Sequence, residues 1–293
     1  ARSPEAQSAA LPYRRLLDDV IARQADLVAR WLLVGFIHGV MNTDNTSIAG
    51  ETIDYGPCAF MDAYHPDQVY SSIDHRGRYA YGQQPRIAHW NLVRFAETLL
   101  PLLAPDEAEA IESAKEALAA FPRLFEASYD SGLGRKLGLA GAEEADLLLA
   151  RDLLERMAEH EADFTLVFRR LADEAEPRSS TATDRRPSDD LPDVPFLQTE
   201  AFTTWAASWR DRLAVQGRDP GLRRAEMRRA SPAYIPRNHR VQQAIEAATE
   251  GRFGPMEELL EVVTRPYDDH PEHVELARPP APHEVVQRTF CGT

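Results

Sequence analysis

The polar segment at residues 36–57 constrains this chain most, because it interrupts a sequence whose remainder has largely helical periodicity. It is rich in Gly, Asn, Asp and Thr, which favour turns, and apolar runs flank it on both sides. Residues 47–48 and 52–53 flank an Ala-Gly turn, so they predict a very short β-hairpin. The pattern therefore predicts a mainly α protein that carries one short hairpin.

Three oxygen-bearing side chains lie within this segment, namely Asp44, Asn45 and Asp54. A hairpin would bring them together, and oxygen ligands suit a Mg²⁺ ion that carries a polyphosphate. His38 precedes the Asp-Asn pair and Asp54-Tyr-Gly follows it, which is the order of parts in a protein-kinase catalytic centre. His38 itself is expected to be structural and to hydrogen-bond backbone near the triplet.

The composition is that of an ordinary soluble globular protein, with 43% hydrophobic and 27% charged residues among 293. No apolar run reaches the roughly 18 residues of a membrane helix, so no membrane association is expected. The net charge of −14 opposes nucleic-acid binding, which depends on Lys and Arg neutralising phosphates. The sequence has only two cysteines, which fits a reducing cytoplasm.

Apolar residues at helical spacing predict a series of helices, with Pro122 and the glycines at 132 and 134 acting as breaks. A stretch poor in apolar residues, 174–197, is expected to be a flexible linker. It would separate a first unit, 1–173, from a second helical region, 198–293. The predicted helices cover 11–34, 87–103, 106–121, 143–159, 162–174, 199–215, 221–229, 238–250 and 255–264.

Several motifs resemble those of the selenoprotein O family (SelO, also called YdiU), and the resemblance spans essentially the whole chain. The two most specific motifs are His38-Gly-Val-Met-Asn-Thr-Asp-Asn45 and Thr52-Ile-Asp-Tyr-Gly-Pro57. Further matches are Ser71-Ser-Ile-Asp-His75, Gly77-Arg-Tyr-Ala-Tyr-Gly82, Gln84-Pro85, Trp90-Asn-Leu92, Tyr234-Ile-Pro-Arg-Asn-His239 and the ending Phe290-Cys-Gly-Thr293.

The resemblance implies a protein-kinase-like C-lobe with a short hairpin at the active-site loop and a C-terminal helical extension. It also implies a protein adenylyltransferase, which moves AMP from ATP to Ser, Thr or Tyr hydroxyls of proteins with Mg²⁺ or Mn²⁺. By resemblance, Asp44 is the catalytic base and Asn45 is a metal ligand. Asp54 binds both the metal and the nucleotide.

Two features depart from an ordinary kinase. Asp44 and Asn45 are adjacent, whereas kinases separate these two residues, so a conventional protein kinase is disfavoured. No Gly-rich loop, strand lysine or partnering glutamate is recognisable before the motif, so we expect the chain to lack the N-lobe. That predicts weak ATP binding and impaired transfer. The alternative function is a non-catalytic remnant, a helical module that binds or regulates a partner.

The sequence also supports expectations for the two cysteines and for a run of arginines. Cys291 is a candidate for redox regulation, because the family carries selenocysteine or cysteine near the C-terminus, whereas Cys58 reads as a small core residue. A basic run is expected mainly to form a solvated helix face that makes ion pairs with the many acids, with contacts to nucleotide phosphates or to an acidic partner as the alternative. It comprises Arg223, Arg224, Arg228, Arg229, Arg237 and Arg240. The oligomeric state and the protein substrates are left open.

Overall fold

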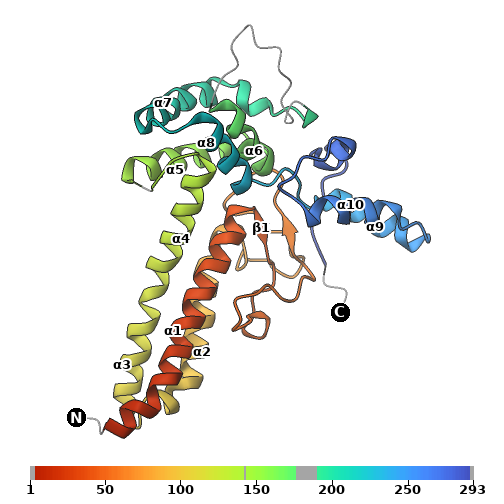
Figure 1. Ribbon diagram of the computed structural model, residues 1–293. Coiled ribbons are helices and arrows are strands. Elements are labelled where there is room, and N and C mark those ends of the chain that lie inside the picture. The colour runs from red at the N-terminus through yellow and green to blue at the C-terminus, as the bar shows by residue number, and fades with distance from the viewer. Residues whose placement is uncertain (1–3, 142, 176–189, 291–293) are drawn as a thin grey trace.

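The computed structural model describes residues 4–141, 143–175 and 190–290 (Figure 1). The chain is mainly helical, as expected, and a two-stranded antiparallel sheet pairs β1 (Phe36–Ile37) with β2 (Ala59–Phe60). The α-helices are α1 (Pro4–Leu33), α2 (Gln84–Leu103), α3 (Glu107–Leu118), α4 (Ala120–Lys136), α5 (Glu144–Glu159), α6 (Phe164–Glu174), α7 (Glu200–Gln216), α8 (Pro220–Ala230), α9 (Asn238–Thr249) and α10 (Gly254–Thr264).

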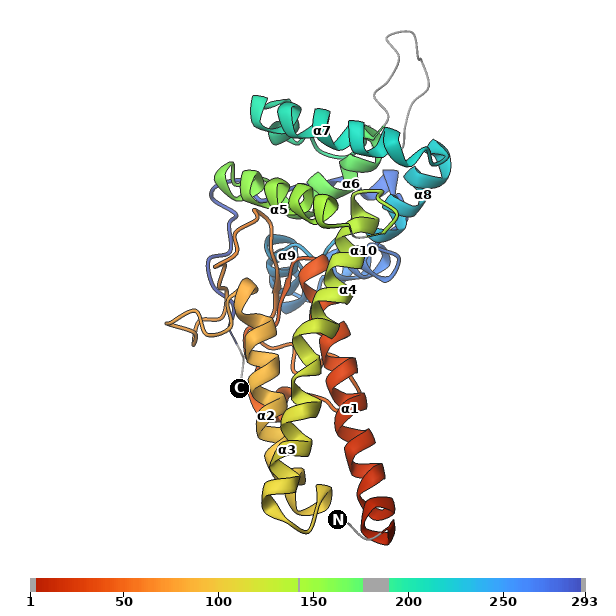
Figure 2. The same ribbon diagram turned by 90° about the vertical axis from the view of Figure 1, so that its left-hand side faces the viewer.

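The helices form an elongated bundle with two groups of helices at one end. Helix α1 packs side by side with α2 and α4, and α3 continues almost directly into α4 (Figures 1 and 2). Helices α5 to α8 lie across one end of this bundle, whereas α9 and α10 lie beside the strands. Within the described ranges, no helix has both the length and the apolar character needed to cross a bilayer.

One face of α1 supplies the centre of the core. Leu17, Val20, Ile21 and Val28 recur at helical spacing and are almost fully buried. At the far end of the molecule, the indoles of α7 are also buried, and Trp209 donates its N–H to the Leu137 carbonyl at 2.9 Å. Burial of a large ring with its polar group satisfied favours one packing arrangement over others.

The sequence pattern does not predict α4, because proline and glycine usually interrupt helices. Pro122 lies in the first turn of α4, where a missing N–H costs little. Gly132 lies where α4 crosses α1, and a Cβ there would come within 2.1 Å of Leu33 Cδ1. This glycine permits close helix packing and does not end the helix. Helix α1 likewise begins earlier than predicted, so Pro12 is inside it.

The predicted hairpin is wrong in its position. Residues 47–53 form turns and coil, and the paired strands are the shorter β1 and β2 outside them. The polar segment 38–58 is therefore the long connection between β1 and β2. Two residues per strand suffice because β1 is buried and contacts α1, and Ala59 of β2 is also buried, so tertiary packing and not strand propensity holds the pair.

The predicted linker at 174–197 is described only in part. Residues 176–189 lie outside the described residues. From residue 190 onward the chain packs against the rest of the protein, since Leu191, Val194 and Phe196 are buried. Arg170 on α6 also donates to the Leu191 carbonyl at 2.6 Å.

A buried arginine joins distant parts of the chain. Arg237 is 1% exposed, and its guanidinium contacts Asp62 at 2.6 Å and Asp163 at 2.8 Å. Its Nε also donates to the Ala277 carbonyl at 2.8 Å. Asp163 additionally caps α6 by accepting from the Leu166 N–H at 2.8 Å. The end of β2, the start of α6 and the C-terminal region thus meet at one charge.

Replacing this arginine is expected to destabilise the fold strongly. Arg237→Met leaves two largely buried carboxylates without their cation, which should lower the free energy of unfolding by about 3–5 kcal/mol. Urea denaturation followed by circular dichroism measures the change. Arg252→Met is the control, because Arg252 is exposed and pairs with the exposed Glu250; it should change stability by less than about 0.5 kcal/mol. Equal losses in both variants would contradict this role.

Candidate functional site

The loop 38–58 has two arms, a first arm that carries Asp44 and Asn45 and a second arm that carries Asp54. Hydrogen bonds fasten both arms to α1. In the first arm, the Ser47 carbonyl accepts from the side chain of Gln24 at 2.7 Å. In the second arm, the Thr52 hydroxyl accepts from the indole N–H of Trp31 at 2.9 Å. Gln24 and Trp31 are buried on α1, so a rigid helix fixes a polar loop that contains little regular structure. Anchoring of this kind is what a preorganised site requires.

His38 links the two arms. Its side chain is 1% exposed, and its Nε2 lies 2.8 Å from the Ile53 carbonyl oxygen. Since a carbonyl only accepts, Nε2 carries the proton, and Nδ1 accepts from the Val40 N–H at 3.4 Å. Burial lowers the pKa of His38, which favours this neutral form. The expected hydrogen bond from His38 to backbone near the Asp54 triplet is confirmed, and its structural role stays a prediction.

Gln84 supports His38 and was singled out by no sequence argument of its own. It is fully buried at the start of α2, where its Oε1 accepts from the His38 backbone N–H at 3.0 Å. Its Nε2 donates to the Phe36 carbonyl at 2.9 Å. The amide thereby satisfies backbone groups that the two-residue strand β1 leaves unpaired. A glutamine next to Pro85 at a helix start carries no sequence signal for such a role.

The first arm places Asp44 and Asn45 in a short 3₁₀ turn, Thr43–Asn45. The side-chain nitrogen of Asn45 donates to the Val40 carbonyl at 2.9 Å, so its oxygen is the atom that could bind a metal. Asp44 is exposed, so its carboxylate is accessible from solvent. The buried Asn91 on α2 holds this arm by donating to the Met41 carbonyl at 3.1 Å.

The second arm presents Asp54 from a left-handed backbone conformation. Its φ is +55°, which is uncommon outside glycine, although Asp and Asn adopt it more readily than other residues. The preceding carbonyl, Ile53, is the one that His38 holds, and the carboxylate of Asp54 is close enough to oppose the lowering of the pKa of His38. Local strain of this type often accompanies a functional site.

The loop also doubles back on itself at Gly39. This residue has φ +80°, and a Cβ there would come within 2.9 Å of the Pro57 carbonyl oxygen. Only glycine therefore lets the two ends of the loop approach so closely. The hydrogen bonds run from Asn45 through Val40 and His38 to Ile53, which joins the bases of the two arms.

The donor chemistry suits a hard divalent cation. Among residues 4–141, 143–175 and 190–290, no group of three or more His, Cys, Asp or Glu side chains is arranged to hold a metal. Mg²⁺ does not need such a cage, because it accepts one or two protein oxygens together with water and substrate phosphates. Asn45 and Asp54 offer one carboxamide oxygen and one carboxylate.

Known proteins resemble this chain over a range that includes loop 38–58. Residues 3–264 match the family model of Protein adenylyltransferase SelO. The chain belongs to the SelO family. It is 54% identical to the Protein nucleotidyltransferase YdiU of Nitrobacter hamburgensis, in an alignment that covers 99% of this chain and 56% of that relative. It is 57% identical to a YdiU of Methylorubrum extorquens, covering 99% of this chain and 58% of the relative. The chain thus spans a little over half the length of these SelO relatives.

The C-terminal segment of this SelO chain lies against the far end of the loop. Thr289 accepts from the Ser72 N–H at 2.9 Å and donates its own N–H to the Tyr70 carbonyl at 2.8 Å. Its hydroxyl donates to the Pro57 carbonyl. Cys58, next to Pro57, is half-buried, and burial raises the pKa of its thiol to about 11, as suits a packing residue. Cys291 lies outside the described residues, and its redox role stays a prediction.

The basic run is only in part the solvated helix face with ion pairs to acids that the sequence predicts, since Arg229 is exposed but other members are buried. Arg237 is buried, as shown above, and Arg223 is 6% exposed and donates to the Leu213 carbonyl at 3.1 Å. Arg224 pairs with Asp173 at 2.6 Å. These arginines do pair with acids and backbone carbonyls as expected, but they do so inside the structure, where the pairing fixes how helices pack.

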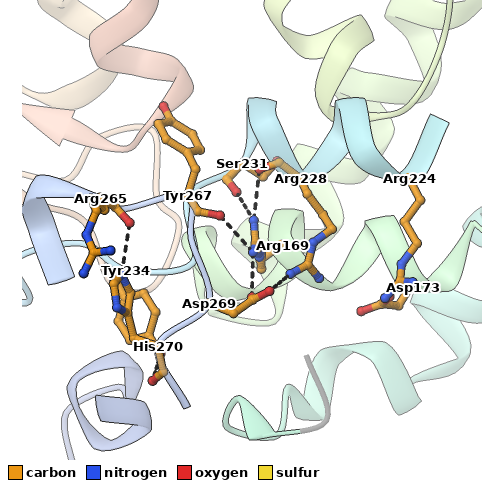
Figure 3. A network of polar contacts seen from close by, with 10 residues as sticks. All are labelled: Arg169, Asp173, Arg224, Arg228, Ser231, Tyr234, Arg265, Tyr267, Asp269 and His270. Atoms are coloured by element: carbon orange, nitrogen blue, oxygen red, sulfur yellow. Dashed lines mark hydrogen bonds and ion pairs between the residues drawn. The ribbon is translucent and has the colours of Figure 1, made fainter. Parts of the chain in front are cut away.

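Arg169 on α6 organises the largest of these contacts, and the sequence pattern did not single it out. Figure 3 shows its guanidinium facing the end of α8 and the segment after α10. It donates to the carbonyls of Arg228 at 2.9 Å, Ser231 at 3.1 Å and Tyr267 at 3.1 Å, and it pairs with Asp269 at 2.8 Å. Nothing in a helical apolar pattern distinguishes a buried arginine of this kind from an exposed one.

Removal of the His38 ring is expected to loosen the second arm of the loop selectively. His38→Ala deletes the hydrogen bond to Ile53, and a lost bond of this type should speed amide exchange around residues 52–56 roughly tenfold. Hydrogen–deuterium exchange with peptide mass analysis measures the change. His75→Ala is the matched control, because His75 is exposed on a neighbouring loop. Uniform faster exchange across α1 and α4 would instead indicate a global loss of stability.

Proposed function

We propose that this chain forms the catalytic half of a protein adenylyltransferase, which moves AMP from ATP onto Ser, Thr or Tyr hydroxyls of other proteins. Membership of the SelO family supports this activity. The observation that carries the proposal is the hydrogen-bonded chain from Asn45 through Val40 and His38 to Ile53, since it ties together the arms that bear Asp44 and Asp54.

In this proposal each polar residue of the loop has one task. Asp44 accepts the proton of the incoming hydroxyl as its oxygen bonds to the α-phosphorus and the bond to pyrophosphate breaks. A positioned base of this type contributes about 10²–10⁴ in rate. Asn45 and Asp54 would hold Mg²⁺ or Mn²⁺, which, when bound, neutralises phosphate charge. His38 and Gln84 touch no reacting atom in this scheme and act as positioning residues.

The proposal assigns this chain to the C-lobe side of a kinase-like fold, with the nucleotide bound against loop 38–58. The chain spans 56% of the Nitrobacter hamburgensis relative, and we place the groups that grip the phosphates in the length not spanned here. Affinity for Mg-ATP should therefore be weak in the chain alone. Isothermal titration measures this affinity, and a micromolar value would contradict the placement of the phosphate-gripping groups outside this chain.

Radioactive labelling tests the reaction directly. A protein of the relatives' full length that contains this chain is incubated with Mg²⁺ and either α-³²P or γ-³²P ATP. We expect protein-bound label only from the α position, because AMP and not phosphate is transferred. Label from the γ position would identify a kinase. Absence of label from both would favour a non-catalytic module that binds a partner.

Replacement of one carboxylate tests the site. Asp54→Ala in that full-length protein should reduce metal-dependent labelling from α-³²P ATP at least about 10²-fold, because metal-assisted charge stabilisation is lost. Glu51→Ala is the matched control, since Glu51 is an exposed carboxylate on the same loop, and it should retain activity. Circular dichroism checks that both variants fold. Unchanged labelling by Asp54→Ala would remove the site assignment while leaving the reaction in place.

A further inference from the structure

A pocket lies between α1, α4 and α8, and no residue of loop 38–58 lines it. Its volume is about 610 Å³, and Tyr267, drawn in Figure 3, contributes from the segment that follows α10. This volume is within the roughly 300–1,000 Å³ of small-molecule sites. The proposed adenylyl transfer assigns no task to this pocket.

The charged side chains of this pocket do not cancel. Of its two acids, Asp26 pairs with Arg30 at 2.6 Å, and Glu226 pairs with Arg218. The remaining cations are Arg135, Arg229 and Lys136, and none of the three has an ion pair with a carboxylate in the described part of the chain. In a protein with a net charge of −14, two unpaired guanidinium groups and a buried amine in one cavity favour an anionic ligand.

Tyr267 lines the same pocket as the arginines. Burial raises the pKa of Tyr267, and the positive charges of Arg135 and Arg30 oppose that rise, so both guanidinium groups act on its hydroxyl. A hydroxyl donor and arginines around one cavity suit a phosphate group, which accepts several charge-assisted hydrogen bonds.

Lys136 is the unusual member of the pocket. It is 2% exposed, its Nζ lies 3.5 Å from the Ser231 hydroxyl, and it sits 4.4 Å from the ring centroid of Phe168. Burial lowers the pKa of Lys136 to about 7, so much of it is a neutral amine near neutral pH. The sequence has only one other lysine, the exposed Lys115. The other long basic side chains that are buried in the described part of the chain belong to arginines, which do not deprotonate.

We propose that this pocket is a binding site for a small phosphorylated ligand, with Arg135 and Arg229 contacting the phosphate and Lys136 facing the inner end of the ligand. Phosphate fits the charge balance better than a single carboxylate does, because it offers two negative charges to several donors. The site is separate from loop 38–58, so the proposal does not depend on the proposed adenylyl transfer.

Pyridoxal 5′-phosphate is a suitable probe, since it joins a phosphate to an aldehyde. A neutral amine attacks the aldehyde carbon, water leaves as the imine forms, and added borohydride supplies the hydride that makes the bond permanent. Digestion and mass analysis then compare the two lysines of the chain. We expect Lys136 to be labelled at least about tenfold more than Lys115, because a retained phosphate contact raises occupancy by that order.

Competition and variants complete the test. Inorganic pyrophosphate should protect Lys136 and leave the labelling of Lys115 unchanged. Arg229→Gln should reduce Lys136 labelling about tenfold, whereas Arg252→Gln, an exposed cation outside the pocket, should not reduce it. Lys136→Met keeps the apolar stem and should fold normally but lose the label. Equal labelling of both lysines, or no protection by pyrophosphate in the folded protein, would overturn the proposal.

Discussion

The contact of Arg237 with Asp62 and Asp163 is the interaction on which the arrangement of this protein depends. Burying one cation and two carboxylates carries a large desolvation cost, which is offset only where distances are short and the remaining donors are satisfied. Here the carbonyl of Ala277 takes one of those donors. The same carboxylate of Asp163 caps α6, so this one charge cluster also determines where that helix begins.

This cluster matters for the site because Asp62 lies two residues after the end of β2. Strand β2 closes the loop 38–58, and Asn238, next to Arg237, donates to the Phe60 carbonyl of β2 at 2.9 Å. One end of the loop is thus held by the C-terminal region, while α1 and α2 hold its two arms. A segment with almost no regular structure gains a defined shape from three separate anchors, which is the usual way a catalytic loop is made rigid.

Two predictions failed for the same physical reason. The sequence pattern predicts a helix break at Gly132, but this residue lies inside α4. A glycine is needed there because Leu33 occupies the space that a Cβ would fill. The hairpin was assigned to the residues with the best strand pattern near the turn, whereas the paired residues are Phe36–Ile37 and Ala59–Phe60. In both cases a long-range packing partner decided the outcome, and local propensity carries no information about that partner.

The sequence by itself determined the helical class, nearly all of the helices, and the residue types of the candidate site. Periodic apolar spacing and the order of His38, Asp44, Asn45 and Asp54 are local properties that can be read without coordinates. The tertiary structure decided which arginines are buried, how Gln84 supports His38, and that Lys136 faces a cavity. These features depend on burial and on contacts between residues far apart in the chain, because the cost of removing a charge from water is set by its surroundings and not by its neighbours in sequence.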